Sequence, residues 1–355
     1  MATRQRWINQ VSLSVCNSTI FPFVFDGKYY HLTGSGVGNK AKRKSLEKTL
    51  GLSEISAESS SSNASRARKG LPKDLLWVKE SLTTAYSVMA PDGDTAQVHP
   101  YLFTTSMLDL AKERGASLVM GRATGIQKVN EQVTGVAYVS SDSSEMQTLP
   151  ATTVVVAAGA WSPKLVNRLP ISTTRAHSIT IRPEPSVTIS PYVLFTEISL
   201  PSHRAPVSPE IYARPDSEVY LCGPGDDFPL PNSVDEVVVD QDACDSIRMH
   251  GASISDELRD GTVEKRQACY LPLVSRAGGP IIGPAPTIAK GLVIATGHTC
   301  WVIAPPIMRI MNSADCFVVQ GICNAPGTGK AIAEFVLDGK MSSGNLAKLD
   351  PARYL

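Results

Sequence analysis

The sequence predicts a mixed α/β (α+β) protein in which an α/β domain is interrupted by a second, β-rich domain. Two continuous apolar runs, Thr152–Ala157 and Leu292–Thr296, are typical of strands buried on both faces. A glycine follows each run closely, Gly159 in one case and Gly297 in the other. Between the runs, residues 176–270 alternate short strand patterns with turns, which is typical of an antiparallel block. We therefore expect the two runs to be neighbouring parallel strands of one sheet.

Composition and charge are those of an ordinary globular protein. Of 355 residues, 43% are hydrophobic and 19% are charged, and 34 Lys and Arg nearly balance 33 Asp and Glu, giving a net charge of +1. This balance does not favour nucleic acid as a partner. The sequence contains no run of about 18 apolar residues, so no membrane span is predicted. The seven cysteines are scattered without a Cys-x-x-Cys pair, which favours reduced thiols in a cytoplasmic protein.

Residues 1–70 differ from the rest of the chain. Lys40–Lys48 is a basic run, and Ser53–Ala67 is serine-rich with almost no bulky apolar side chain. Such a stretch buries too little surface to offset its chain entropy, so residues 53–70 are interpreted as a disordered linker in a poorly ordered N-terminal region. The α/β domain is then expected to consist of two segments, residues 71–175 and 271–350. The β-rich domain, residues 176–270, lies between them in the sequence.

Periodicity and turn residues assign the main elements. We expect helices at Tyr101–Gly115 and Thr328–Leu337 and strands at Ala116–Met120, Gly125–Val129 and Val133–Val139. The clearest hairpin is Glu210–Gly223, because its turn contains Pro, Asp and Ser between two β-rich runs. Asp240–Leu258 stays unassigned.

Two groups of small residues are candidate ligand-contacting segments. In the first, a strand runs into Ala158, Gly159, Ala160 and Trp161, which let a ligand approach the backbone. In the second, glycines precede a helix, whose exposed amide groups and dipole favour partial negative charge. The residues of this second group are Gly297, His298, Gly321, Asn324, Gly327 and Thr328. Each group also has a purely structural interpretation, as a core strand with a tight exit and as a helix capped by a threonine.

Three other patterns do not carry a function. Gly327–Lys330 resembles the end of a phosphate-binding P-loop, but Ala331 replaces the required Ser or Thr. Gly34–Asn39 resembles a dinucleotide loop, but asparagine takes the place of its last glycine. His298 and Cys300 lack further ligands nearby in the sequence, so no metal site is predicted.

Several segments of the chain together match a known family in their order and spacing. They are Thr95–Pro100, Val154–Pro163, Pro209–Asp216, Val219–Gly223, Cys269–Pro272, Gly279–Pro284, Gly297–Trp301 and Gly321–Lys330. In this order they resemble the D-amino-acid-oxidase-like family of FAD-dependent oxidoreductases, in a fungal-type branch. The resemblance implies a Rossmann-like FAD-binding domain and a β-rich substrate domain, with FAD held by the two candidate groups. It also implies oxidation of a carbon that bears an amine, with hydride transfer to flavin and a small amine or amino-acid-like compound as substrate.

The chain departs from this family in two ways. Members open with a strand and Gly-x-Gly-x-x-Gly, which the sequence does not contain, so we expect an FAD domain that is incomplete at its N-terminus and impaired in FAD binding. Amino-acid-oxidising members commonly have an arginine just before the proline that corresponds to Pro272, where this chain has Leu271. The substrate-contacting candidates are Tyr212, Arg214, Tyr270 and Arg276. The alternative hypothesis is a non-catalytic protein of the same fold that binds a partner.

Residues 302–320 are interpreted as an insertion that does not belong to the evolved fold. Joining Trp301 to Gly321 restores a segment that resembles the uninterrupted C-terminal flavin motif of the family. The insertion begins with Val302 and ends with Gln320, whose codons can supply the first and last nucleotides of an intron. A natural loop is the other interpretation, but a loop of this length rich in Ile, Met, Phe and Val would expose much apolar surface.

Overall fold

A computed structural model of the chain describes residues 25–26, 29–33, 71, 75–83, 85–88, 96–201, 203–214, 216–275, 279–298 and 321–355. Within these residues the largest unit is a seven-stranded sheet of order β13-β9-β12-β11-β10-β2-β3. Its strands are β2 (Tyr29–Thr33), β3 (Ala85–Val88), β9 (Ile171–Arg182), β10 (Val193–Thr196), β11 (Glu210–Ala213), β12 (Val219–Asp226) and β13 (Thr262–Val274). All neighbouring pairs are antiparallel except β10 and β2. Five of its strands lie within residues 171–274, close to the segment expected to be β-rich, whereas β2 and β3 come from outside that segment.

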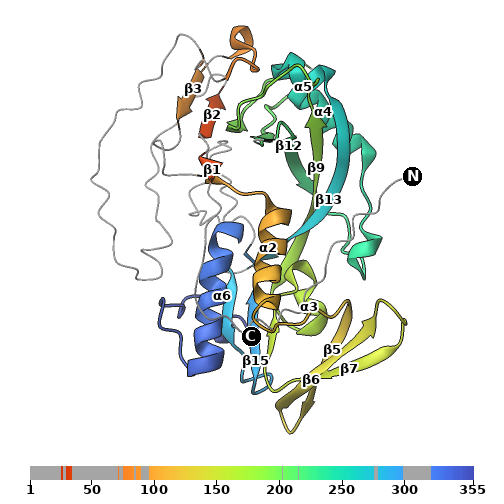
Figure 1. Cartoon of the computed structure of the whole chain (residues 1–355), viewed down its shortest axis with the longest axis vertical. Coiled ribbons are helices and arrows are strands. Elements are labelled where there is room, and N and C mark those ends of the chain that lie inside the picture. Colours follow the sequence, from red (N-terminus) through yellow and green to blue (C-terminus); the bar gives the residue numbers. More distant parts are fainter. Residues whose placement is uncertain are drawn as a thin grey trace.

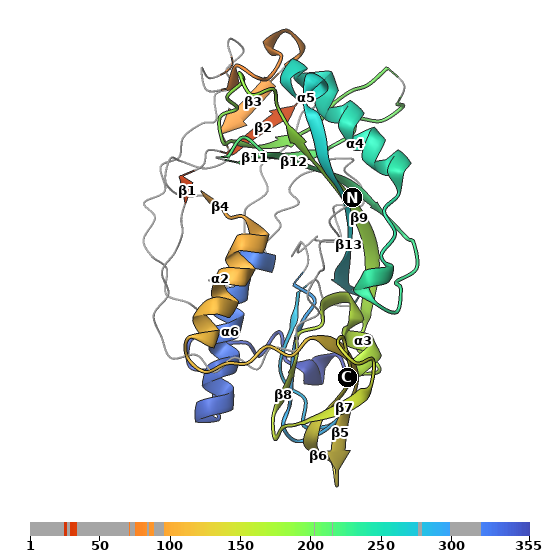
Figure 2. The same cartoon turned by 45° about the vertical axis from the view of Figure 1, so that its right-hand side comes forward.

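The large sheet has an apolar outer face and a polar, aromatic inner face. Side chains alternate between the two faces along each strand. Ile211 and Leu221 lie on the outer face, where they are fully buried, whereas Tyr212 and Tyr220 lie on the inner face. The outer face packs against α4 (Gln241–Ile254) and α5 (Asp256–Asp260). In Figures 1 and 2, α4 and α5 lie outside the sheet, and α2 (Pro100–Lys112) and α6 (Gly321–Asp338) lie on its other side.

A three-stranded sheet of order β14-β15-β8 forms the core of the other domain. Its strands are β8 (Val154–Val156), β14 (Ile281–Pro284) and β15 (Leu292–Thr296). Val293 packs on one face with Ile332 of α6, while Val156 and Ile294 pack on the other face with the β5-β6-β7 meander. Because both faces are covered, the strands read as continuous apolar runs.

The remaining elements are short or peripheral. The meander consists of β5 (Gly121–Val129), β6 (Gln132–Ser140) and β7 (Met146–Pro150), and β1 (Phe25–Asp26) pairs with β4 (Ala96–Gln97). The short helices are α3 (Ser162–Leu165), η2 (Glu80–Leu82), η3 (Gly159–Trp161), η4 (Val234–Glu236) and η6 (Pro351–Arg353). None of the helices in the described ranges is both long enough and apolar enough to cross a membrane.

Several sequence predictions are confirmed. β8 and β15 are adjacent and parallel, with Val154 opposite Leu292. β11 and β12 form the expected hairpin, with Tyr212 opposite Tyr220. The helix expected at Tyr101–Gly115 is α2. β5 and β6 contain the two strands expected on either side of the turn near residue 130.

Other predictions are wrong or fall outside the description. Ala116–Met120 is not a strand; β5 begins at Gly121, opposite Ser140, the last residue of β6. α6 begins at Gly321 rather than Thr328, so the presumed turn is helical. Unassigned segment 240–258 forms α4 and α5. In the N-terminal region, β2 joins the large sheet. Residues 53–70 and 302–320 lie outside the described residues.

Candidate functional site at the ends of β8 and β15

Two glycines with left-handed backbone conformations end the paired strands. Gly297 follows β15 with φ +79°, and a Cβ there would lie 2.4 Å from Val274 Cγ2. Gly159 follows β8 with φ +51°, and a Cβ there would meet no atom within 4 Å. Both positions favour glycine for their backbone conformation, and only Gly159 leaves open space beside the main chain. Ligand access to the backbone is therefore possible at the end of β8.

A buried hydroxyl pair ties the two strand ends together. Ser162 Oγ donates to Thr296 Oγ1 at 2.8 Å, and Thr296 Oγ1 donates to the carbonyl of Gly159 at 3.1 Å. Ser162 is fully buried and Thr296 is nearly so. Since each hydroxyl has a partner, the pair fixes the backbone at residue 159 relative to β15 without an unpaired buried group.

His298 joins the end of β15 to α6. Its Nε2 lies 2.9 Å from Thr328 Oγ1, and a Cβ on Gly321 would lie 2.6 Å from the His298 carbonyl oxygen. Burial lowers the pKa of His298 to about 4, so the ring is neutral at pH 7. The structure thus brings Gly297, His298, Gly321 and Thr328 together. Asn324 lies between them along α6 and is half-buried.

Trp161 and Tyr270 hold a loop. The Nε1 of Trp161 donates to the carbonyl oxygen of Pro231 at 2.9 Å. The hydroxyl of Tyr270 donates to the carbonyl oxygen of Pro229 at 2.8 Å. Their rings meet edge to face with centroids 6.0 Å apart. The polar atoms of both side chains are therefore engaged with the segment after β12, as is the amine of Lys164. Nearby Ala158 is half-buried and Ala160 is buried in η3.

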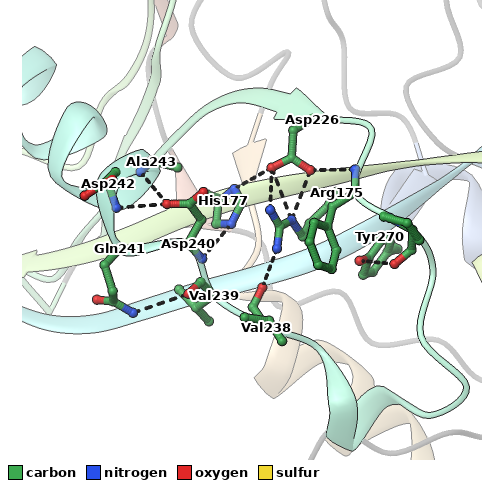
Figure 3. A network of polar contacts seen from close by, with 12 residues as sticks. Arg175, His177, Asp226, Val238, Val239, Asp240, Gln241, Asp242, Ala243 and Tyr270 are labelled. Atoms are coloured by element: carbon green, nitrogen blue, oxygen red, sulfur yellow. Dashed lines mark hydrogen bonds and ion pairs between the residues drawn. The ribbon is translucent and has the colours of Figure 1, made fainter.

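A charged network, which the sequence analysis missed, anchors the same loop (Figure 3). Arg175, whose side chain is 5% exposed, holds Asp226 through three hydrogen bonds of 2.8–3.2 Å. Its Nη1 donates to Val238 O at 2.9 Å. His177 Nε2 accepts from the Asp240 N–H at 3.1 Å, so the proton of the neutral ring lies on Nδ1. Burial, then the charge of Arg175, lowers the pKa of His177, which keeps the ring neutral.

The other substrate candidates lie on or beside the inner face of the large sheet. The Tyr212 hydroxyl donates to Glu210 Oε2 at 2.5 Å. Arg214 Nη1 donates to Glu218 and lies 3.3 Å from His99 Nε2, which precedes α2. The charge of Arg214 is thus already compensated by a carboxylate. Arg276 lies outside the described residues.

Glu210 and Glu218 were missed although the sequence contained a signal for both. Glu210 lies two residues before Tyr212 on the same strand, so both side chains point to the same face. Glu218 stands across the hairpin from Arg214 and therefore shares that face too. Among the described residues, no group of at least three His, Cys, Asp or Glu side chains could hold a metal ion.

The strand ends, the helix that follows them and the facing sheet define a class, the two-domain flavin-dependent oxidoreductases. A family model described as FAD dependent oxidoreductase, DAO, matches residues 21–335, and the chain belongs to this family. The match begins well ahead of residue 71, where the resemblance drawn from the motifs starts.

Two fungal relatives are similar over most of the chain. The protein named "Putative oxidoreductase TDA3" of Saccharomyces cerevisiae is 34% identical over 316 residues, covering 80% of this chain and 56% of the relative. A Schizosaccharomyces pombe protein with the same kind of name is 33% identical over 293 residues, covering 79% of this chain and 70% of the relative. The chain therefore spans just over half the length of the first of these relatives.

Solved structures of similar fold include an iminodiacetate oxidase and a glycine oxidase. Iminodiacetate oxidase from Chelativorans sp. BNC1 has a TM-score of 0.60 at 20% identity, covering 92% of this chain and 76% of the other. Glycine oxidase from Geobacillus kaustophilus has a TM-score of 0.58 at 16% identity, covering 94% and 76%. At these identities the likeness establishes the fold.

FAD is the cofactor of the family, and the strand-end residues suit its flavin half. A Cβ on Gly159 would meet no atom within 4 Å, so the backbone is open there, and free amide groups at a helix start favour an electron-rich carbonyl. The neutral ring of His298 adds no positive charge there.

Proposed function

We propose that this protein oxidises a CH–NH bond of a small molecule, with FAD as hydride acceptor. The observation that carries the proposal is the convergence of Gly159, His298 and the start of α6 at one edge of the β14-β15-β8 sheet. When bound, FAD would accept the hydride and pass the electrons to dioxygen, and the protein would supply orientation and electrostatics.

The chain's own residues would hold the cofactor and exclude water. The backbone of residues 158–161 and 297–298 and the first turns of α6, with Gly321, Asn324, Gly327 and Thr328, are the proposed flavin contacts. The Ser162–Thr296 hydroxyl pair keeps the two strand ends in register. Trp161 and Tyr270 act by holding the loop after β12 over this region rather than by direct chemistry. The inner face of the large sheet would then bind the substrate.

FAD binding by the 355-residue chain itself is expected to be weak. The pyrophosphate of a dinucleotide is usually held by a glycine turn and the helix after it, and the sequence lacks Gly-x-Gly-x-x-Gly. The alternative is a non-catalytic protein of the same fold that binds a partner. We also propose a cytoplasmic protein with seven reduced thiols, which thiol titration of the protein denatured without reductant would test.

One titration separates these functions. The purified chain is titrated with FAD while its visible absorbance and flavin fluorescence are followed. We expect saturable but weak binding, in the micromolar range or above, which corresponds to a free energy of about −8 kcal/mol or weaker. Stoichiometric flavin in the purified protein would refute the expected impairment. No binding at millimolar FAD would refute the oxidoreductase proposal for this chain and leave the non-catalytic alternative.

A further inference from the structure

Two carboxylates on the inner face of the large sheet have opposite surroundings. Glu218 is 3% exposed and lies between two cations, with Lys265 Nζ 2.8 Å from Oε1 and Arg214 donating to Oε2. Burial alone would raise the pKa of Glu218, but the hydrogen bond from Lys265 and the charge of Arg214 bring that pKa below its usual value. The negative charge of Glu218 is therefore compensated within the protein.

Glu210 has no such compensation in the described part of the chain. Its Oε2 accepts a hydrogen bond from the Tyr212 hydroxyl at 2.5 Å and lies 3.9 Å from Cys222 Sγ. Among the residues whose side chains the structure describes, which do not include those of β2 and β3, no Lys, Arg or His forms an ion pair with Glu210, and no hydrogen bond reaches its Oε1. Burial raises the pKa of this carboxyl group, against the opposing effect of the Tyr212 hydrogen bond. One carboxyl oxygen on the inner face is thus left for a ligand.

Aromatic residues of the inner face lie beside Glu210. Glu210 stands opposite Phe195 on β10 and Cys222 on β12. The ring of Tyr212 meets those of Phe195 and Tyr220 edge to face, with centroids 6.3 Å and 5.8 Å apart. Aromatic faces attract cations, and they do so more strongly where water is excluded. Arg214 already lies over the ring of Tyr220, 5.5 Å from its centroid, so the rings left for a cation near Glu210 are those of Tyr212 and Phe195.

We propose that Glu210, oriented by Tyr212, binds the ammonium group of the substrate, and that the protein selects amines without requiring a substrate carboxylate. This assignment rests on the proposed function for its identification of the inner face as the substrate site. An ammonium N–H donates to the unused Oε1 while Tyr212 keeps Oε2 in place. Of the described candidates, neither offers a substrate carboxylate a comparable partner, since Arg214 is paired with Glu218 and Leu271 carries no charge. Glu210 is thus a specificity-determining residue.

The inference is tested with three ligands of matched shape on the intact chain. Benzylamine, benzyl alcohol and benzoate are titrated by calorimetry, with and without saturating FAD. We expect benzylamine to bind at least about tenfold more tightly than the alcohol and benzoate to bind least, because a charge-assisted hydrogen bond is lost with either replacement. Equal affinities, tighter benzoate, or no binding of any of the three would overturn the proposal.

Variants then assign the effect to the carboxyl group. Glu210→Gln should weaken benzylamine by about tenfold or more and leave benzyl alcohol unchanged, and Tyr212→Phe should weaken benzylamine about threefold. Glu184→Gln, a change of the same type at an exposed position, is the matched control and should have no effect. A Glu210→Gln protein that melts like the parent and keeps benzylamine affinity would also overturn the proposal. Flavin binding is measured separately. A chain that prefers benzylamine but does not bind FAD would contradict the proposed function alone. Flavin reduction by amines that is unchanged in Glu210→Gln would contradict this inference alone.

Discussion

Replacing Asp226 by asparagine tests whether the Arg175 network holds the loop over the candidate site. Arg175 would remain buried, with its side chain 5% exposed, while its carboxylate partner would lose its charge. Removing one partner of a buried ion pair costs about 3–5 kcal/mol, and because Asp226 itself is 38% exposed we expect about 2–3 kcal/mol. The asparagine side chain is nearly isosteric, so this loss reports charge rather than packing.

Glu264→Gln is the matched control. Glu264 makes the same two-oxygen contact with Arg182, but the two side chains are 34% and 37% exposed, so its loss should cost about 0–1 kcal/mol. Both variants are unfolded with urea at pH 7 and followed by circular dichroism and tryptophan fluorescence. Losses that agree within about 0.5 kcal/mol would show that burial of the Arg175 pair adds nothing.

The same pair predicts a pH dependence. The hydrogen bond from Arg175 lowers the pKa of Asp226 below its usual value. A carboxyl group with a lowered folded-state pKa stabilises the protein above the unfolded-state value of about 3.9 and loses this contribution as pH falls through the folded-state pKa. The difference between the parent and Asp226→Asn should therefore be full at pH 7 and shrink below about pH 4. A difference that stays constant down to pH 3 would contradict the assignment.

Two further predictions concern the strand ends. Gly297→Ala should lower the free energy of unfolding by at least about 2 kcal/mol, because the new Cβ would clash with Val274 in addition to the strain of positive φ. The control is Gly115→Ala at φ +92°, where a Cβ meets open space and the loss should be only about 1 kcal/mol. Equal urea midpoints of the two variants would contradict this prediction. His298 should titrate near pH 4 by NMR, and since burial lowers its folded-state pKa, its contribution to stability is full above about pH 6.5 and falls as pH drops toward 4. A titration midpoint above 6 would contradict its burial.

Local signals in the sequence were enough for the elements that carry the fold. β8 and β15 each combine an apolar, mostly β-branched run with a glycine that follows it. Run and glycine lie within six residues of each other, so a short stretch of sequence is enough to recognise each strand and its end. The hairpin of β11 and β12 is specified by its own turn and by alternating side chains. α4 could also have been recognised, since Asp240 caps it by accepting from the amides of residues 242 and 243.

The polar networks and the start of α6 could not be read in this way. Arg175 and Asp226 are 51 residues apart, and His99 and Arg214 are 115 apart, so only the fold shows that they meet. Glycines and Pro326 argue locally against a helix before residue 328. In the structure Gly321, the first residue of α6, lies against the end of β15, a proximity that local sequence does not reveal. Of the candidate site, the backbone positions were therefore predictable and the charged partners were not.

The described residues on either side of the proposed insertion lie side by side. A Cβ on Gly321 would be 2.6 Å from the carbonyl oxygen of His298, and His298 also bonds Thr328. If residues 302–320 were removed, three residues would link His298 to Gly321, and such a link reaches up to about 13 Å. The shortened chain can therefore close without moving β15 or α6.

We therefore propose that a chain lacking residues 302–320 folds at least as well as the full chain. Its urea midpoint should be equal or higher, because deleting residues 302–320 leaves the described contacts intact and shortens the connection between His298 and Gly321, which gains up to about 2 kcal/mol. A variant with a Gly-Ser linker of the same 19 residues separates length from sequence and should resemble the full chain in stability. Should the natural segment exceed both variants by more than about 1 kcal/mol, it packs as part of the evolved fold. Sequencing of the mature transcript decides its origin, since a dominant message that carries these codons would exclude a retained intron.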